Sequence, residues 1–260
     1  MNEKKYKKIW HLIWTLAITD FRLRYHGAIL GFLWSLLQPL LMFTVMFVVF
    51  SSIFRTQGTN SEYYALELLT SLTVFMFFSQ GTMSGLSSFV DKQSILTKIA
   101  TPLWTVILSS SMNTFLIFLT NILIIILFFA FSSFIPSISA IVFFFFSLIQ
   151  MIFLILSFSF FAAPLYVRFR DVTMIWEVVT RILMYASPII YPLSMMPADV
   201  QKILLLNPLA FIIHFQKEAL IYNHFPTFFQ SALFSVSILG VFLCSLLFYK
   251  KYSKNIIELL

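Results

Sequence analysis

The stretch that decides the fold is Arg168-Phe-Arg-Asp-Val-Thr-Met-Ile-Trp-Glu-Val-Val-Thr-Arg-Ile-Leu-Met-Tyr-Ala-Ser-Pro-Ile-Ile-Tyr-Pro192. After its charged opening it is apolar for long enough to cross a bilayer core, at about 1.5 Å per helical residue and about 30 Å of hydrocarbon. Glu177 and Arg181 lie inside it, where an ionised side chain costs about 2.5 kcal/mol or more. Their spacing puts them on one helix face, with the acid first, and favours an intramembrane ion pair. We expect this face to point into protein or a wet cavity, either to hold helices together or to serve transport.

The composition is that of an integral membrane protein. Of the 260 residues, 60% are hydrophobic and only 10% are charged, whereas soluble domains contain about 25% charged residues. The mean hydropathy is +0.94. The chain therefore has room for one all-α membrane domain over residues 1–260 and for no second sizeable soluble domain. A single cysteine, Cys244, excludes a disulfide framework within the chain.

Apolar runs separated by polar segments predict six transmembrane helices. The predicted spans are 28–54, 63–88, 105–131, 140–167, 172–193 and 227–249. Residues 4–24 are too charged to span, and their helical apolar spacing predicts an amphipathic helix at the membrane interface. Residues 89–104 predict a short amphipathic helix that ends at Pro102 and that either lies flat on the membrane or docks into a partner.

The segment 199–224 decides the topology. It is apolar in part, but Asn207-Pro208 breaks it, so we predict a re-entrant or surface helical pair on the outer face. Both termini then lie in the cytosol, together with 13 of the 17 Lys and Arg residues, as the positive-inside rule favours. Arg55, Lys202 and Lys217 fall outside. The helical pair is either an outer gate or a capping loop without a gating role.

The sequence contains no recognisable catalytic, cofactor or metal site. Its six glycines form neither a phosphate-binding loop nor a dinucleotide fingerprint. The four histidines are scattered, with none at metal-ligand spacing beside a carboxylate. The spans also lack the chain of buried acids that a proton-coupled pump needs. A transport function would therefore draw its energy from another subunit, and no nucleic acid partner is expected.

Four stretches carry a resemblance to a known family. They are TDFRLRYHGAILGFLWSLLQP at 19–39, RFRDV at 168–172, SPIIYP at 187–192 and NPL at 207–209. Through them the chain resembles the membrane subunit of ABC-2 type exporters of lipid-linked polysaccharides, the group that contains the teichoic acid, O-antigen and rhamnose-polysaccharide permeases.

The resemblance implies a homodimer of six-helix subunits in the bacterial cytoplasmic membrane, bound to two copies of a separate ATPase. That partner would use ATP and Mg²⁺, and this chain would bind no cofactor. The cargo would be a glycan or polyol-phosphate chain on undecaprenyl diphosphate, which crosses between the two subunits. Within 89–104, the residues expected to couple to the ATPase are Lys92, Ile95, Leu96 and Lys98, and 195–224 would form outer gate helices.

Two further residue sets suit such a cargo. Sugars stack on aromatic rings and bond to their polar tips, so the expected channel lining is Trp34, Trp176, Tyr185 and Tyr191. The alternative is that these rings mark the interface belts. Guanidinium forks suit phosphate, so the residues expected to hold the lipid diphosphate at the cytosolic mouth are Arg22, Arg24, Arg168 and Arg170. The alternative is ordinary positive-inside charge.

Three rival functions stay open at this point. An ABC-2 permease for a small lipophile or drug would share the fold but have a lipid-facing cleft without an aromatic lane. A membrane-embedded glycosyl or acyl transferase would need an acid or histidine cluster at a membrane mouth, and the sequence shows none. A purely structural assembly subunit would carry no transport route.

Overall fold

The computed structural model describes residues 2–24, 26–55, 61–98, 101–132, 134–253 and 256, and every regular element in them is helical. The elements are α1 (Asn2–Arg24), α2 (Leu33–Arg55), α3 (Ser61–Asp91), α4 (Gln93–Leu96), α5 (Trp104–Phe131), α6 (Ile138–Arg168), α7 (Val172–Tyr185), the 3-10 helix η1 (Leu193–Met195), α8 (Ala198–Leu205), α9 (Pro208–Tyr222) and α10 (Phe228–Tyr252). The predicted all-α class is confirmed.

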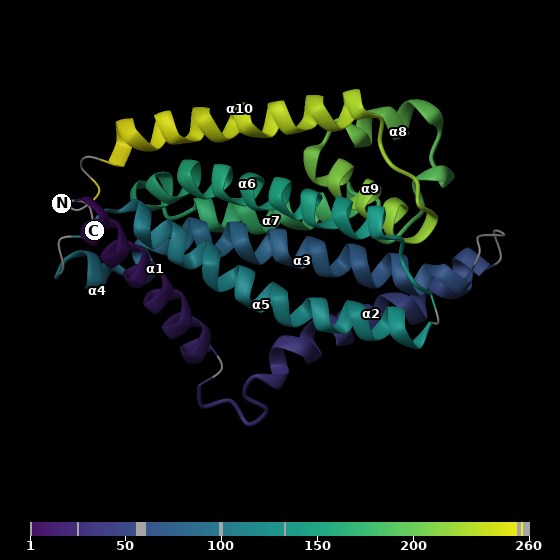
Figure 1. Cartoon of the computed structure of the whole chain (residues 1–260), viewed down its shortest axis with the longest axis horizontal. Coiled ribbons are helices and arrows are strands. Elements are labelled where there is room, and N and C mark those ends of the chain that lie inside the picture. Colours follow the sequence, from purple (N-terminus) through teal and green to yellow (C-terminus); the bar gives the residue numbers. More distant parts are fainter. Residues whose placement is uncertain are drawn as a thin grey trace.

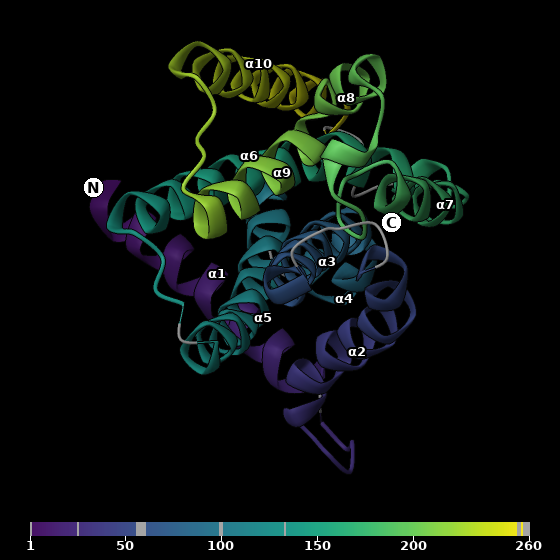
Figure 2. The ribbon, with the colours of Figure 1, turned by 90° about the vertical axis from the view of Figure 1, so that its right-hand side faces the viewer.

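The long helices α3, α5, α6 and α10 run along the long axis of the molecule (Figure 1). Helix α3 lies at the centre and packs against α2, α5, α6, α7 and α9, as the view along the bundle shows (Figure 2). We call the end at which α1 begins and α10 ends the near end, and the end that holds α8 and α9 the far end. Helix α1 runs obliquely from the near end and packs on α5.

Small residues bring α3 and α6 into close contact. Gly81 lies against the side chain of Ile155, and Gly85 lies against Ser159. A Cβ atom at Gly85 would overlap both side-chain atoms of Ser159. Glycine at these positions therefore lets the two helix backbones approach, as small residues do at helix contacts in membranes.

Gly85→Ala is expected to destabilise the protein by about 1–3 kcal/mol, the usual cost of overpacking a core. A thermal unfolding curve in detergent measures the effect. The matched control is Gly240→Ala on α10, where an added Cβ meets nothing within 4 Å. In that helix the same change is expected to be neutral or to stabilise by up to about 1 kcal/mol. Equal melting temperatures for the two variants would contradict this packing.

Helices occupy all six predicted spans, and in four of them the bounds differ from the prediction by no more than three residues. The other two differ by more. Helix α2 begins at Leu33 instead of residue 28, because Gly27 and Gly31 have φ of +83° and +48° and hold the chain in turns. Helix α7 ends at Tyr185 instead of 193, because the following segment with Pro188 and Pro192 is turned. With 14 residues, α7 is only about 21 Å long, less than a bilayer core.

Four helices in the described part of the chain are individually long and apolar enough to cross a membrane: α2, α5, α6 and α10. Helices α8 and α9 form a fifth candidate if they count as one broken span, with a bend of 109° between them. Asn207 makes the break by accepting a hydrogen bond from the Leu209 amide at 3.1 Å, while Pro208 opens α9. The far end thus contains a bent helical pair, as the sequence predicted for 199–224.

The segment 89–104 differs from the predicted amphipathic helix. Helix α3 continues to Asp91, and α5 already begins at Trp104. Among the residues described between them, 92–98 and 101–103, only the four of α4 are helical. The apolar residues that suggested a longer helix belong to different elements, Phe89 to α3 and Leu96 to α4. Both pack with Val106 of α5 in one buried cluster at the near end.

Candidate functional site

A polar cleft in the near-end half of the bundle is lined by residues of α1, α3 and α7. Its volume is about 320 Å³. Its lining comprises Arg24 from α1, then Ser79, Gln80, Met83 and Ser84 from α3, and Glu177, Thr180 and Arg181 from α7. Three segments that are far apart in the sequence therefore bring two guanidinium groups, a carboxylate, an amide and hydroxyl groups to one place.

Glu177 and Arg181 lie on the same side of α7, as their spacing predicted, but they do not form the expected ion pair. No N–O distance between them is within 4.0 Å, and both side chains are exposed at the surface of the single chain. Both line the cleft instead. The charges of this helix therefore face an open space, and each remains available to a molecule that enters it.

Of the four arginines predicted to hold a lipid diphosphate, only Arg24 reaches the cleft. Arg22 is exposed on α1. At the turn between α6 and α7, the guanidinium of Arg168 lies 5.5 Å from the ring centroid of Phe169, and that of Arg170 lies 5.3 Å from that of Tyr166. The predicted set is thus divided between the cleft and the near-end surface, and Arg181 joins Arg24 in the cleft.

The four aromatic residues predicted to line a channel have different surroundings. The Trp176 indole donates a hydrogen bond to the Thr82 hydroxyl at 3.0 Å and stacks on Phe158 with the ring centroids 3.7 Å apart. The Tyr191 hydroxyl donates to the backbone carbonyl of Tyr185 at 3.1 Å. Trp34 is exposed on α2, which packs on α3 and α5. Of these four residues, only Tyr185 and Tyr191 contact each other within one chain.

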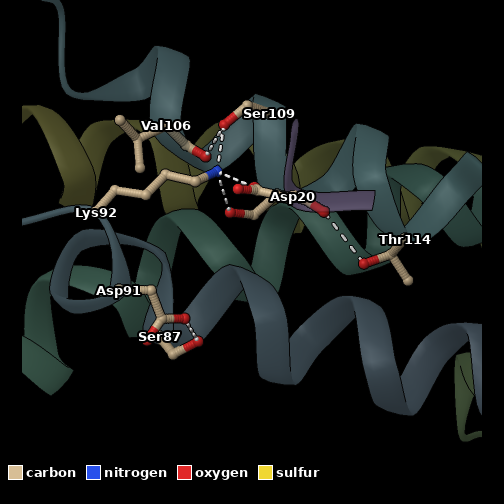
Figure 3. Close-up of polar contacts among 8 residues, drawn as sticks. Asp20, Ser87, Asp91, Lys92, Val106, Ser109 and Thr114 are labelled. Atoms are coloured by element: carbon tan, nitrogen blue, oxygen red, sulfur yellow. Dashed lines mark hydrogen bonds and ion pairs between the residues drawn. The ribbon is translucent and has the colours of Figure 1, made fainter. Parts of the chain in front are cut away.

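Lys92, one of the predicted ATPase contacts, is buried, with only 6% of its surface exposed. Its ammonium group pairs with Asp20 of α1 at 2.7 Å and donates to the hydroxyls of Ser109 at 2.7 Å and Ser110 at 3.2 Å on α5 (Figure 3). Burial lowers the pKa of Lys92 from its usual value, while the hydrogen bond and the charge of Asp20 oppose that shift. Lys92 therefore ties α1 to the near-end segment and presents no charge to a partner.

The other three predicted coupling residues also differ in exposure. Leu96 is 5% exposed and packs in the near-end cluster, and Ile95 is half-buried. Lys98 is exposed, as are Ser94 and Thr97 beside it. The surface that a partner can reach at this segment is therefore polar and contains one cation among its described residues.

The far end contains a buried charged cluster that the sequence analysis did not foresee. The ammonium of Lys217, which is 2% exposed, lies 3.3 Å from the Glu67 carboxylate and donates to the backbone carbonyl of Pro188 at 2.9 Å. The Tyr222 hydroxyl donates to the same carboxylate at 2.6 Å. Tyr64 donates to the Ile190 carbonyl at 2.9 Å. Helices α3 and α9 thus hold the SPIIYP segment in place.

The signal for this cluster was present in the sequence. Glu67 is the one charged residue of the predicted span 63–88, and Lys217 lies beside Glu218 in a second, partly apolar segment. Opposite charges in such segments pair with each other inside a membrane protein. We predicted that Lys217 would lie on the outer side but assigned it no partner. The Lys92–Asp20 pair also had a signal in the sequence, because Asp20 is an acid beside basic residues of α1.

Comparisons with known proteins agree with this architecture. A family model described as "ABC-2 type transporter" matches residues 11–225. An O-antigen export system permease protein RfbA of Klebsiella pneumoniae is 28% identical over 205 residues, which cover 79% of this chain and 78% of that protein. A protein of the same name from Myxococcus xanthus is 28% identical over 218 residues, which cover 82% and 81% of the two chains.

Proposed function

Because this chain belongs to the ABC-2 type transporter family and is a multi-pass membrane protein, we propose that it is the permease subunit of a polysaccharide exporter. In this proposal it moves a glycan linked to undecaprenyl diphosphate from the cytosolic to the outer face of the bacterial cytoplasmic membrane. The observation that carries the proposal is the similarity to two O-antigen export permeases over about four fifths of the chain.

The assembly we propose is a homodimer with two copies of a separate ATPase, and both termini of the chain in the cytosol. The near end then faces the ATPase, since it holds the short α4 segment, Arg168, Arg170 and the last turn of α10 with its two lysines. This orientation agrees with the positive-inside rule. The bent pair α8 and α9 then lies on the outer side, where it forms the proposed gate.

The geometry supports motion of rigid parts. ATP-driven closure of the ATPase subunits would push on the exposed face of the near-end segment. The Lys92–Asp20 pair and the contacts with Ser109 join that segment to α1 and α5, so a displacement there moves both helices together. The energy comes from the partner, and this chain supplies the passage.

Deletion of the gene tests the proposed function directly. Surface glycan is expected to disappear, and the lipid-linked glycan is expected to accumulate on the cytosolic side of the membrane. Immunoblotting of intact cells against lysed cells separates the two pools. Normal surface glycan in the deletion strain would overturn the proposal.

Lys98→Glu is expected to reduce the amount of ATPase that co-purifies with the permease by at least a few-fold, because it reverses the one described cation on the exposed face of the near-end segment. Quantitative mass spectrometry of the purified complex measures the ratio of the subunits. The matched control, Lys202→Glu, reverses an exposed charge on α8 at the far end and is expected to leave the ratio unchanged. An unchanged ratio for both variants would refute this docking surface.

One observation favours a second candidate, an ABC-2 permease for a small lipophile. A mostly apolar cleft of about 450 Å³ lies among α6, α7 and α10, where Trp176, Cys244 and Phe248 belong to its lining. Apolar clefts of this size bind small molecules. The deletion strain distinguishes the two candidates, since this one predicts normal surface glycan and a changed tolerance of lipophilic compounds.

A further inference from the structure

An apolar groove lies between the first half of α1 and the bundle. Trp10 and Ile13 of α1 form one wall, and α3, α5 and α6 form the other, with Leu108 of α5 and Ile152 of α6 among the lining residues. All the lining residues except Ser111 are apolar or aromatic. A sugar or a charged headgroup would find almost no hydrogen-bond partner inside this groove, so its composition selects a hydrocarbon.

The way in which α1 crosses the bundle leaves this space open. Helix α1 packs mainly on α5 and runs obliquely to the long helices (Figures 1 and 2). Ile13 and Ala17 are 3% and 0% exposed and hold α1 against the bundle, whereas Trp10 is 60% exposed. The Trp10 ring therefore stands at the edge of the groove, where the wall formed by α1 meets the surroundings of the protein.

The groove lies at the depth of one leaflet of a bilayer. Leu108 and Phe115 line it and follow the near-end start of α5 at Trp104 by 4 and 11 residues, which is about 6 and 17 Å along the helix. Since a hydrocarbon core is about 30 Å thick, the groove belongs to the near-end half of the membrane. A lipid of that leaflet can place an acyl chain in the groove without leaving the bilayer.

The size of the groove excludes larger occupants. Its volume is about 240 Å³, below the roughly 300 Å³ at which sites for drug-sized ligands begin. A helix of a partner subunit, about 10 Å across with its side chains, does not fit between α1 and the bundle. A single acyl chain is slender enough, and it supplies the van der Waals contacts that an empty groove would lack.

The charge beside the groove selects the headgroup of that lipid. Lys7 is exposed and precedes Trp10 by three residues, so it lies one helical turn closer to the near end on the same side of α1. The first eight residues contain four lysines and one acid, Glu3. Basic residues at this level of a membrane attract anionic lipids. A headgroup whose chain occupies the groove points toward the near end and hence toward these cations.

We propose that the groove holds one acyl chain of an anionic phospholipid from the near-end leaflet, with the phosphate of the headgroup beside Lys7. This lipid is a bound component of the permease and not its cargo. It fills the space between α1 and α6, so it holds α1 in position, and α1 in turn holds the near-end segment through the Asp20–Lys92 pair. The inference goes beyond the proposed function, and only the identification of this leaflet as the cytosolic one rests on it.

The test measures lipid binding to the purified full-length protein, with whatever subunits co-purify, after removal of the native lipids. Native mass spectrometry compares three probes: dioleoylphosphatidylglycerol, dioleoylphosphatidylcholine and glycerol 3-phosphate. Phosphatidylglycerol is expected to bind at least 5-fold more tightly than phosphatidylcholine, the equivalent of about 1 kcal/mol for one lysine near an anionic surface. Glycerol 3-phosphate is expected not to bind, because it has the anionic group without an acyl chain.

Two variants assign the binding to this groove. Lys7→Gln is expected to weaken phosphatidylglycerol binding by about 5-fold and to leave phosphatidylcholine binding unchanged. Ser111→Phe fills the groove with a ring and is expected to weaken binding of both lipids by at least 10-fold. The matched control is Lys251→Gln, which removes an exposed cation at the near end of α10 and is expected to have no effect. If Ser111→Phe does not fold, Lys7→Gln still decides the test, since that side chain is exposed.

A melting curve gives a second measurement. Phosphatidylglycerol is expected to raise the melting temperature of the wild type, because a ligand that binds only the folded state stabilises it. The increase is expected to be smaller for Lys7→Gln and absent for Ser111→Phe.

Three results would overturn the inference. Equal binding of the two phospholipids would show that α1 does not select an anionic headgroup. Binding of glycerol 3-phosphate as tight as that of phosphatidylglycerol would make the site one for free phosphate compounds. Unchanged lipid binding by both Lys7→Gln and Ser111→Phe would place the lipid elsewhere. The proposed function fails separately: a deletion strain with normal surface glycan refutes the exporter whichever lipid binds the groove.

Discussion

Asp20→Ala is expected to lower the stability of the permease by about 3 kcal/mol, near the lower end of the range for breaking a buried ion pair. The variant leaves the Lys92 ammonium at 6% exposure with only the Ser109 and Ser110 hydroxyls as partners. An isolated ammonium group cannot remain charged there without a large desolvation cost. The melting temperature in detergent, followed by loss of monodisperse protein on gel filtration, measures the change.

The double variant Asp20→Leu, Lys92→Met provides the control for this pair. It removes both charges together, so no unpaired group remains, and most of the lost stability is expected to return. If Asp20→Ala melts like the wild type, α1 is not held to the near-end segment through this contact. If the stable double variant also exports glycan normally, the pair stabilises the fold but does not transmit motion.

Glu67→Ala is expected to have a still larger effect, about 3–5 kcal/mol, because both charges of its pair are almost fully buried. Lys217 is 2% exposed and Glu67 is 8% exposed. Without the carboxylate, Lys217 keeps only the Pro188 carbonyl, and the Tyr222 hydroxyl loses its acceptor. We expect little folded protein in the membrane fraction, as an immunoblot after detergent extraction would show.

Two further variants separate charge from hydrogen bonding at this cluster. Glu67→Gln with Lys217→Met removes both charges but keeps an oxygen that can accept from Tyr222, so near-normal amounts of folded protein are expected. Lys202→Met breaks the exposed pair with Asp199, whose side chains are 78% and 92% exposed, and a pair of that kind contributes at most about 1 kcal/mol. A similar loss for Glu67→Ala and Lys202→Met would contradict the buried pair.

The elements of this fold were largely predictable, because each depends on residues close together in the sequence. Apolar runs located α3, α5, α6 and α10, and Asn207-Pro208 located the break between α8 and α9. The bounds were less predictable. Hydropathy continues through residues 28–32, and only the left-handed conformations of Gly27 and Gly31 delay the start of α2.

The partners of polar side chains could not be predicted in the same way. The spacing of Glu177 and Arg181 on one helix suggested a pair, but the open cleft beside α7 leaves both free. Lys92 pairs instead with Asp20, which precedes it by 72 positions, and Lys217 pairs with Glu67, which precedes it by 150. Such pairs depend on how helices pack, and a single sequence gives no direct measure of packing.

The measurement that tests the central claim most directly is purification of the tagged full-length protein from its own membranes in mild detergent, with mass spectrometry of everything that co-purifies. The account predicts an ATPase subunit in an amount equal to that of the permease, together with a saccharide linked to undecaprenyl diphosphate. The contradicting result is the absence of any ATPase under conditions in which other membrane complexes of the same cells remain intact.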